Sequence, residues 1–332
     1  MSVGEGNNIM HNAITDVPGF RVGHAQDRVA ATGCTVVLCP PGTVGGLDIR
    51  GSAAGTRQTD SLLPFHFVDE LHAVLLSGGS AFGLDASGGV MKVLEEKEIG
   101  YQTSAAKVPI VPTAIIFDLG IGESRVRPDQ EMAYQACLRS QAGPVEEGSV
   151  GVGTGATVGK LMGVRLATKG GVGSSSISLA SGLVVAALVV VNAFGDVIDA
   201  KEGRILAGAR DPQDPERFID SAAMIKGGAS VRRPESAFQN TTLGVVATNV
   251  KLSKRQATKV AQMAQSGLAR TISPIHSTVD GDLIFALSAG DKQADVNAVG
   301  IMAGEVVAAS VIWAVRAADG LGYLPAYRDL HK

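Results

Sequence analysis

The stretch FQNTTLGVVATN, residues 238–249, joins a polar segment to an apolar run. Before it, residues 210–240 carry three prolines and many polar side chains, a composition typical of an exposed linker. After it, residues 243–250 (LGVVATNV) have the composition of a buried β-strand. Thr241 and Thr242 stand at the junction. The pattern is compatible with a turn that opens a strand, and also with a threonine hydroxyl placed for chemistry.

Other apolar runs predict a mixed α/β protein. Strands are expected at 35–40, 73–79, 111–119, 183–199 (as two strands divided near 192–196), 243–250 and 283–290. Several runs are apolar on both faces, which predicts sheets that are covered on both sides. Strands and helical segments interleave, but not in strict β-α-β alternation.

Helical signals lie between these runs. Ser253 and Gln256 form a capping box ahead of a helix at 254–270. A second helix is expected at 84–97. A third, at 295–316, is predicted to pack through one face made of Val299, Met302, Val306, Ala309 and Trp313.

Composition excludes several functional classes. The net charge is −3, and no cluster of Lys and Arg with interleaved aromatic residues suggests a nucleic-acid surface. The apolar run 183–191 is far too short to cross a membrane, and Glu305 interrupts the longer run at 296–315. The first residues show no signal peptide. We therefore expect a cytoplasmic protein without nucleic-acid or membrane partners.

The common site motifs give little support for a cofactor. In the glycine-rich stretch GVGTGATVGK (151–160), the P-loop pattern fails at Thr154 and Leu161, and no convincing strand precedes it. Its glycines are better suited to close backbone approach beside a cavity. The histidines show no metal spacing, although His276 lies near carboxylates. No metal or cofactor is predicted.

Asp280 and Asp282, separated by Gly281, precede the apolar run 283–290. In an extended segment both carboxylates point the same way, although this composition is also common in solvated turns. A threonine hydroxyl becomes a good nucleophile when its own α-amine acts as the base, which requires a chain cut before it. A cut at Asn240–Thr241 would give Thr241 that amine, and the two fragments would stay together because the new strand is interior.

Taken together, the motifs resemble a known family. They are ITDVPGFRVGHA (14–25), RGSAAGTRQTDSL (50–62), LLSGGSAFGLDASGGV (75–90), VPIVPTAIIFDL (108–119), GTGATVGK (153–160), KGGVGSSS (169–176), VVVNAFGDV (189–197) and NTTLGVVATN (240–249). In this order they resemble the self-processing N-terminal-nucleophile hydrolases that include the D-aminopeptidases, β-aminopeptidases and nylon-oligomer hydrolases.

The resemblance implies a four-layer αββα sandwich formed by one domain, residues 1–332. It implies cleavage between Asn240 and Thr241 into chains 1–240 and 241–332, with Thr241 as the nucleophile. Asn192 is expected to stabilise the oxyanion. Asp280 and Asp282 are expected to hold the α-amine. Oligomers of processed heterodimers are expected on the same grounds.

The resemblance also bears on the substrate. Aminopeptidase members typically carry serine after the cut, whereas Thr241 with the later aspartate pair resembles the nylon-oligomer hydrolases, which cut linear amides of 6-aminohexanoate. Lys160 falls where those enzymes carry an active-site lysine, and Lys169 is the rival position. An aminopeptidase that releases small or β-amino residues and an acyltransferase on the related fold remain alternatives.

Overall fold

The computed structural model describes residues 10–229 and 240–331, and two five-stranded sheets dominate them. The first sheet has the order β1 (Arg21–Asp27), β2 (Thr32–Leu38), β5 (Ala73–Ser77), β8 (Thr113–Ile115) and β4 (Thr56–Arg57). The second has the order β11 (Gly171–Ser178), β12 (Val184–Asn192), β15 (Thr241–Val250), β17 (Leu283–Lys292) and β3 (Val44–Ile49). Neighbouring strands are antiparallel except β5–β8 and β15–β17, which are parallel.

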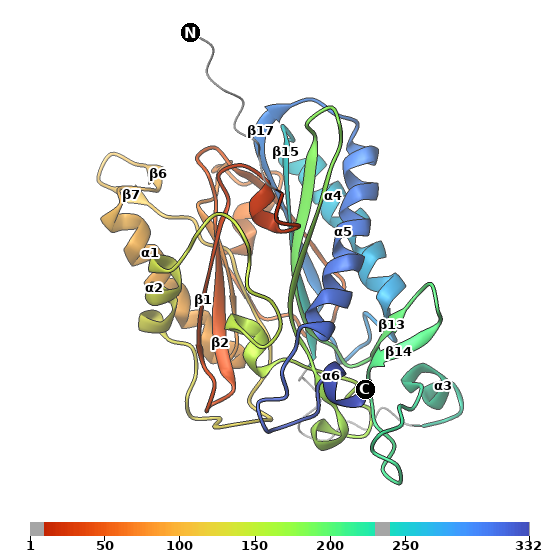
Figure 1. Ribbon diagram of the computed structural model, residues 1–332. Coiled ribbons are helices and arrows are strands. Elements are labelled where there is room, and N and C mark those ends of the chain that lie inside the picture. The colour runs from red at the N-terminus through yellow and green to blue at the C-terminus, as the bar shows by residue number, and fades with distance from the viewer. Residues whose placement is uncertain (1–9, 230–239, 332) are drawn as a thin grey trace.

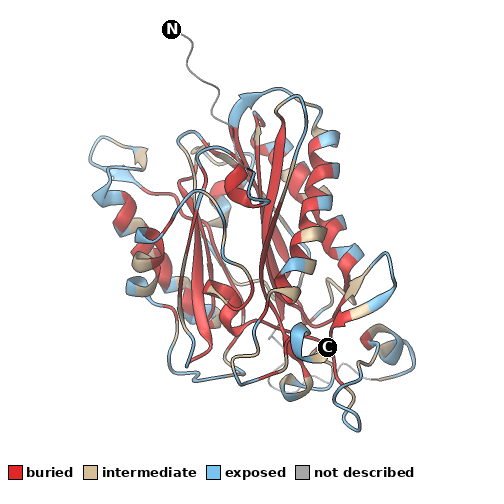
Figure 2. Cartoon of the chain, viewed as in Figure 1, coloured by how far each residue is buried: buried red, intermediate tan, exposed pale blue. Residues whose placement is uncertain are grey.

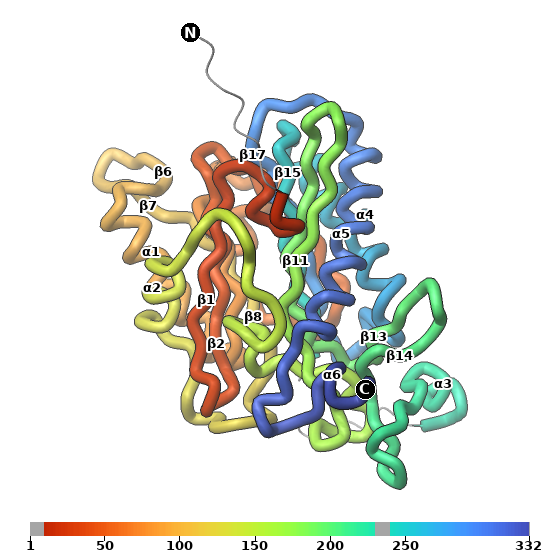
Figure 3. The backbone as a smooth tube through the Cα atoms, viewed as in Figure 1, coloured from red at the N-terminus to blue at the C-terminus, as the bar shows by residue number. Residues whose placement is uncertain are grey.

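Helices cover the outer faces of the two sheets (Figures 1 and 3). Helices α1 (Ser87–Glu96) and α2 (Gln130–Leu138) pack on the first sheet, and α4 (Lys254–Thr271) and α5 (Val296–Arg316) pack on the second. A third apolar layer fills the space between the sheets, and the central strands are buried along their length (Figure 2). The expected αββα sandwich is confirmed.

Shorter elements fill the ends of the sandwich. The remaining strands are β6 (Tyr101–Gln102), β7 (Lys107–Val108), β9 (Thr157–Val158), β10 (Thr168–Lys169), β13 (Asp196–Asp199), β14 (Arg204–Ala207) and β16 (Ile272–Ser273). The remaining helices are α3 (Ser221–Lys226) and α6 (Tyr327–Leu330), with 3-10 turns at Ile14–Asp16, Thr59–Leu62, Ser80–Ala86, Gly151–Gly155 and Val164–Leu166.

Local sequence signals placed most central elements correctly. β12 ends at Asn192 and β13 begins at Asp196, where the sequence divides its longest apolar run. The Ser253–Gln256 capping box opens α4 as predicted. β15, however, begins at Thr241 rather than Leu243, so the two threonines belong to the strand.

The predicted packing face of α5 was wrong in part. Val299, Met302 and Val306 are buried, but Trp313 is 44% exposed. Smaller residues of α5 face β11, because this strand lies very close to the helix. A Cβ atom on Gly173 would lie 2.1 Å from the Ser310 carbonyl oxygen. An indole does not fit there. By length and apolar composition α5 could cross a membrane, but 61% of its most apolar window is buried inside the protein.

Most of the described residues between 211 and 229 are exposed, as expected of a linker, but the segment is anchored at buried positions. Arg210 and Ser221 are buried, and α3 begins after an Asp220 N-cap. The buried Asp196 carboxylate anchors the segment by accepting hydrogen bonds from the Ala209 amide (2.9 Å) and the Ser221 amide (2.8 Å). Residues 230–239, the last part of the predicted linker, lie outside the described residues.

Candidate active site

Thr241 is the first residue of β15, where it pairs with Asn192, the last residue of β12. Both residues are buried. Side chains alternate along a strand, and Leu243 and Val190 contribute to the apolar layer between the two sheets. The Thr241 hydroxyl and the Asn192 amide therefore project from the second sheet toward the first, side by side at one end of two central strands.

The peptide bond before Thr241 is held from two sides. The Asn240 carbonyl oxygen accepts the Gly281 amide at 2.8 Å and lies 2.5 Å from the Thr241 hydroxyl oxygen. Position 281 has no room for a side chain, since a Cβ atom there would lie 2.8 Å from that hydroxyl and 2.8 Å from the Ala53 oxygen. The hydroxyl thus lies against the carbonyl group of its own preceding residue.

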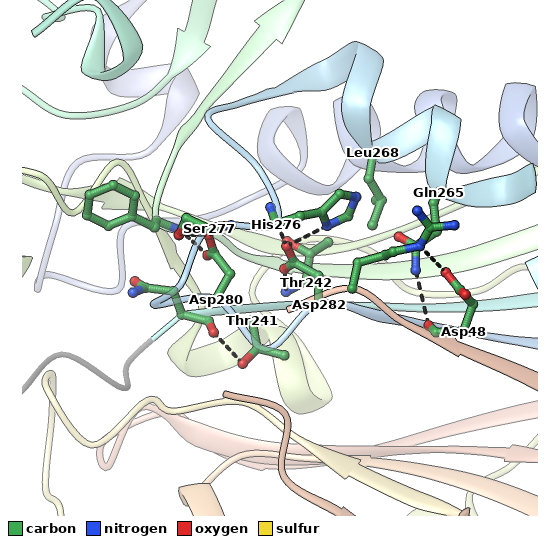
Figure 4. A network of polar contacts seen from close by, with 12 residues as sticks. Asp48, Thr241, Thr242, Gln265, Leu268, His276, Ser277, Asp280 and Asp282 are labelled. Carbon is green, nitrogen blue, oxygen red and sulfur yellow. Dashed lines mark hydrogen bonds and ion pairs between the residues drawn. The ribbon is translucent and has the colours of Figure 1, made fainter. Parts of the chain in front are cut away.

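The two aspartates share one face of the chain, as predicted, but it is the face toward α4 (Figure 4). Asp282 accepts the Thr242 amide at 2.7 Å, and its other oxygen accepts the His276 amide at 3.0 Å and contacts the His276 ring Nδ1 at 3.1 Å. Figure 4 shows the Thr241 side chain on the opposite side of the strand. Asp282 therefore binds the amide of Thr242, not that of Thr241.

Asp280 is fully buried and accepts the Phe194 amide at 3.2 Å and both the amide and the hydroxyl of Ser277. Burial raises the pKa of its carboxyl group to about 6, and the nearby Asp282 carboxylate adds to this shift. The sequence pointed to neither Ser277 nor Phe194. Their contribution depends on loop geometry that no short motif encodes.

Lys160 lies beside Asn192. Its ammonium group donates to the oxygens of Thr157 (2.8 Å), Asn192 (2.9 Å) and Ala193 (3.2 Å), and to the Asn192 side-chain oxygen at 3.0 Å. Burial lowers the pKa of this lysine to about 7, although Asp280 and Asp282 oppose the shift. The ammonium therefore reaches the strand position directly opposite Thr241.

Lys169, the rival lysine, is fully buried in a different place. Its ammonium group donates to the oxygens of Ala156 (2.7 Å) and Thr154 (3.0 Å) within the glycine-rich segment. The structure therefore brings Lys160, rather than Lys169, to Asn192.

The glycine-rich segment also borders a narrow pocket next to Asn192. The Asn192 side-chain nitrogen donates to the Phe117 oxygen at 3.2 Å, and its oxygen accepts the Thr157 amide at 3.0 Å. The pocket is lined by Phe117, Asp118, Gly120, Ile121, Gly155, Thr157, Lys160 and Val164. Gly155 has no space for a side chain, because a Cβ atom would lie 2.4 Å from that of Asp118. The glycine-rich segment therefore provides close backbone approach beside a cavity.

Within residues 10–229 and 240–331, no group of three or more His, Cys, Asp or Glu side chains is arranged to hold a metal ion.

Two facing sheets between helical layers define an N-terminal-nucleophile hydrolase fold, which solved structures share. The family model and the named relatives show that the protein is a hydrolase of amide bonds. The chain belongs to peptidase family S58, whose family model matches residues 12–322.

Several relatives and solved structures are similar to the chain. An uncharacterized aminopeptidase of Mycobacterium leprae (strain TN) is 44% identical, covering 95% of this chain and 93% of its own length. A 6-aminohexanoate-oligomer endohydrolase of Kocuria sp. (strain KY2) is 29% identical, covering 91% and 85%. Among solved structures, a Burkholderia sp. β-aminopeptidase superposes with a TM-score of 0.68 at 21% identity, covering 99% and 95%.

A second solved structure bears on the fold class. The L-aminopeptidase D-Ala-esterase/amidase of Ochrobactrum anthropi, described as a variant of the N-terminal-nucleophile hydrolase fold, superposes with a TM-score of 0.68 at 19% identity. The alignment covers 93% of this chain and 87% of that structure.

Proposed function

We propose that the protein cuts itself between Asn240 and Thr241 and then hydrolyses linear amides with Thr241 as the nucleophile. The observation that carries the proposal is the 2.5 Å contact between the Thr241 hydroxyl oxygen and the Asn240 carbonyl oxygen. This contact places the hydroxyl within reach of the carbonyl carbon. The Gly281 amide, which already binds that carbonyl oxygen, is positioned to stabilise the negative charge that develops on it.

Self-cleavage then takes place through an ester intermediate. The Thr241 hydroxyl oxygen attacks the Asn240 carbonyl carbon, and the carbon–nitrogen bond breaks as the hydroxyl proton passes to the departing nitrogen. The Thr241 nitrogen becomes a free α-amine, and Asn240 is held as an ester. Water hydrolyses this ester, which releases the Asn240 carboxylate and restores the hydroxyl.

The new α-amine would serve as the base in substrate turnover. The Thr242 amide points toward β17, where it meets Asp282. Because backbone direction alternates along a strand, the Thr241 nitrogen points toward β12 and Asn192. Lys160 donates to the Asn192 oxygen at the same position. A neighbouring ammonium lowers the pKa of an amine, which keeps a fraction of it neutral and able to accept a proton.

The names of the relatives give two candidate substrate classes. The first candidate is a 6-aminohexanoate oligomer, since a relative at 29% identity is named a 6-aminohexanoate-oligomer endohydrolase. The second candidate is an aminopeptidase substrate, since relatives at 42–44% identity carry that name. Parallel kinetics on a 6-aminohexanoate oligomer and on amino-acid p-nitroanilides distinguish the classes through the larger kcat/KM.

The purified wild-type protein is expected to contain two polypeptides, residues 1–240 and 241–332, because self-cleavage creates the nucleophile. Intact-mass spectrometry under denaturing conditions measures both fragments directly. An active preparation in which all the protein is one uncut 34.0 kDa chain would contradict the proposal.

Protonation of the Asp280 carboxyl group should lower kcat/KM at acidic pH, which gives the pH profile an acidic limb. Its pKa is about 6, so kcat/KM is expected to rise from pH 5 to pH 7 as the carboxylate ionises. Asp280→Asn should lower kcat/KM at pH 7 by about 10- to 100-fold and remove this limb. Thermal unfolding should show a folded variant. An unchanged acidic limb in Asp280→Asn would assign that titration to another group.

A further inference from the structure

Residues 141–148 cross the edge of the sandwich from one sheet to the other, and a pocket lies beside them. Gln141 pairs with Val22 at the edge of the first sheet, and Gly148 pairs with Val172 at the edge of the second. The pocket has a volume of about 130 Å³ and lies beside β11, with α5 and the start of the described chain as its other walls. The lining residues that decide its chemistry are His11, Ala13, Pro144, Val145, Glu147 and Trp313.

Hydrogen bonds to β11 hold the walls of this pocket in place. The Ile14 amide donates to the Ser174 hydroxyl at 2.8 Å, which fixes the N-terminal turn against the strand (Figure 3). Gly148 and Val172 exchange two backbone hydrogen bonds, of 2.7 and 2.9 Å, which fix the end of the crossing segment. A pocket with walls that are already ordered loses little conformational freedom when a ligand binds.

Glu147 gives the pocket a negative charge that no basic side chain offsets. One oxygen of this half-buried carboxylate accepts the Ser174 amide at 2.7 Å. Among the residues that the structure describes, no Lys, Arg or His side chain forms an ion pair with Glu147. Burial raises the pKa of the Glu147 carboxyl group, although the Ser174 amide opposes the shift. A cation in the pocket would therefore stabilise a charge that burial disfavours.

Trp313, the only tryptophan of the chain, gives the same pocket an aromatic wall. Within the described part of the chain, its ring forms neither an aromatic pair nor a cation–π contact. The face of an indole ring is the aromatic surface that attracts organic cations most strongly.

The rest of the lining distinguishes an organic cation from a metal ion. Ala13, Pro144 and Val145 are apolar and supply no metal ligand through their side chains. No metal-binding group of three or more His, Cys, Asp or Glu side chains includes Glu147 or any other described residue. One carboxylate, one indole and apolar neighbours suit an ammonium group that carries an alkyl chain.

We propose that the pocket between Glu147 and Trp313 is a second binding site, which takes a small alkylammonium cation. The ammonium group donates to the Glu147 carboxylate, and the indole and the apolar lining contact the alkyl chain. Hydrolysis of an amide bond releases an amine, and alkylamines are protonated near pH 7. The reaction of this hydrolase therefore produces ligands of the class that fits the pocket.

The second site is separate from the candidate active site. Ser174, which binds Glu147, pairs with Leu188 on β12, and Asn192 lies four residues further along that strand. Four residues of β-strand span about 13 Å. A ligand beside Glu147 therefore leaves Asn192 and Thr241 unoccupied.

The single tryptophan provides the measurement. Titration of the full-length protein with butylammonium chloride, at constant ionic strength, should change the Trp313 fluorescence in a saturable way. Glu147→Gln keeps an oxygen for the Ser174 amide but removes the charge, so it should weaken binding at least about 10-fold. Glu146→Gln is the matched control: Glu146 is exposed and lines a neighbouring cavity instead, so its dissociation constant should equal that of wild type.

Charge and ring are then tested separately. 1-Butanol, which has the same chain length without the charge, should bind at least about 10-fold more weakly than butylammonium. Isothermal titration calorimetry should show binding of butylammonium to Trp313→Leu about 3- to 10-fold weaker than to wild type. The unfolding temperature of every variant identifies a misfolded protein. The proposal is overturned by a wild-type protein without saturable binding, by 1-butanol binding as tightly as butylammonium, or by a folded Glu147→Gln or Trp313→Leu protein with the wild-type constant.

Discussion

Thr241→Ala is expected to yield a single uncut chain with no measurable amide hydrolysis, a loss of at least about 1,000-fold. The substitution removes the oxygen that both attacks the preceding carbonyl and forms the acyl-enzyme ester. It leaves a buried methyl group in β15, so the sandwich should still form. Denaturing gel electrophoresis and intact mass report the cleavage, and amide hydrolysis assays report the activity.

Thr242, the residue next to Thr241, provides a matched control. Thr242 projects toward the helix side, and within the described part of the chain its hydroxyl oxygen is buried without a hydrogen-bond partner. Thr242→Val keeps the shape and removes that unsatisfied group, so it should process normally and be neutral or more stable by up to about 1–3 kcal/mol. Cleavage after residue 240 in Thr241→Ala would refute the assigned nucleophile.

Gly281→Ala is expected to slow self-cleavage by about 100-fold or more. The added Cβ atom would lie 2.8 Å from the Thr241 hydroxyl oxygen and 2.8 Å from the Ala53 oxygen. Neither has room to move freely, because Thr241 begins a central strand and Ala53 donates its amide to the Asp280 oxygen. The hydroxyl or the Gly281 amide must therefore leave the Asn240 carbonyl group. Loss of one oxyanion donor alone typically reduces the rate 100- to 1,000-fold.

Gly227→Ala is the matched control for this change. Its backbone does not require glycine, and its nearest neighbours, the carbonyl oxygens of Ala223 and Met224, would lie at an ordinary 3.4 Å. The readout is the fraction of uncut chain over time, with thermal unfolding to establish folding. A folded Gly281→Ala protein that is cut at the wild-type rate would remove Gly281 from the proposed step.

Sequence patterns located the elements of the fold because the signals are local. The division of the run at Asn192 and the capping box at Ser253 each depend on a few adjacent residues, and both appear in the structure as predicted. The face of α5 was not predictable in the same way. Gly173 on β11 lies against Ser310 and Ala314, so small residues rather than Trp313 face that strand, and this contact joins residues far apart in the chain.

In the candidate site, too, local sequence identifies residues, whereas tertiary structure decides how they are arranged. The residues themselves pointed to Thr241 and the aspartate pair, each at the border of an apolar run, and the family resemblance added Asn192. Their mutual arrangement is a tertiary property. The pairing of β12 with β15 sets Asn192 opposite Thr241, and strand alternation turns Asp282 to the other side of the sheet, where it meets His276.

For the two lysines, residue type and spacing could not decide, because both lie in glycine-rich segments of similar character. Only the folded chain directs the Lys160 ammonium to Asn192 and encloses that of Lys169 among the carbonyl groups of residues 153–156. The sequence by itself thus determined which strands, helices and reactive groups the protein contains, since neighbouring residues encode them. Only the tertiary structure decided which groups meet, because strand pairing and close backbone packing set those distances.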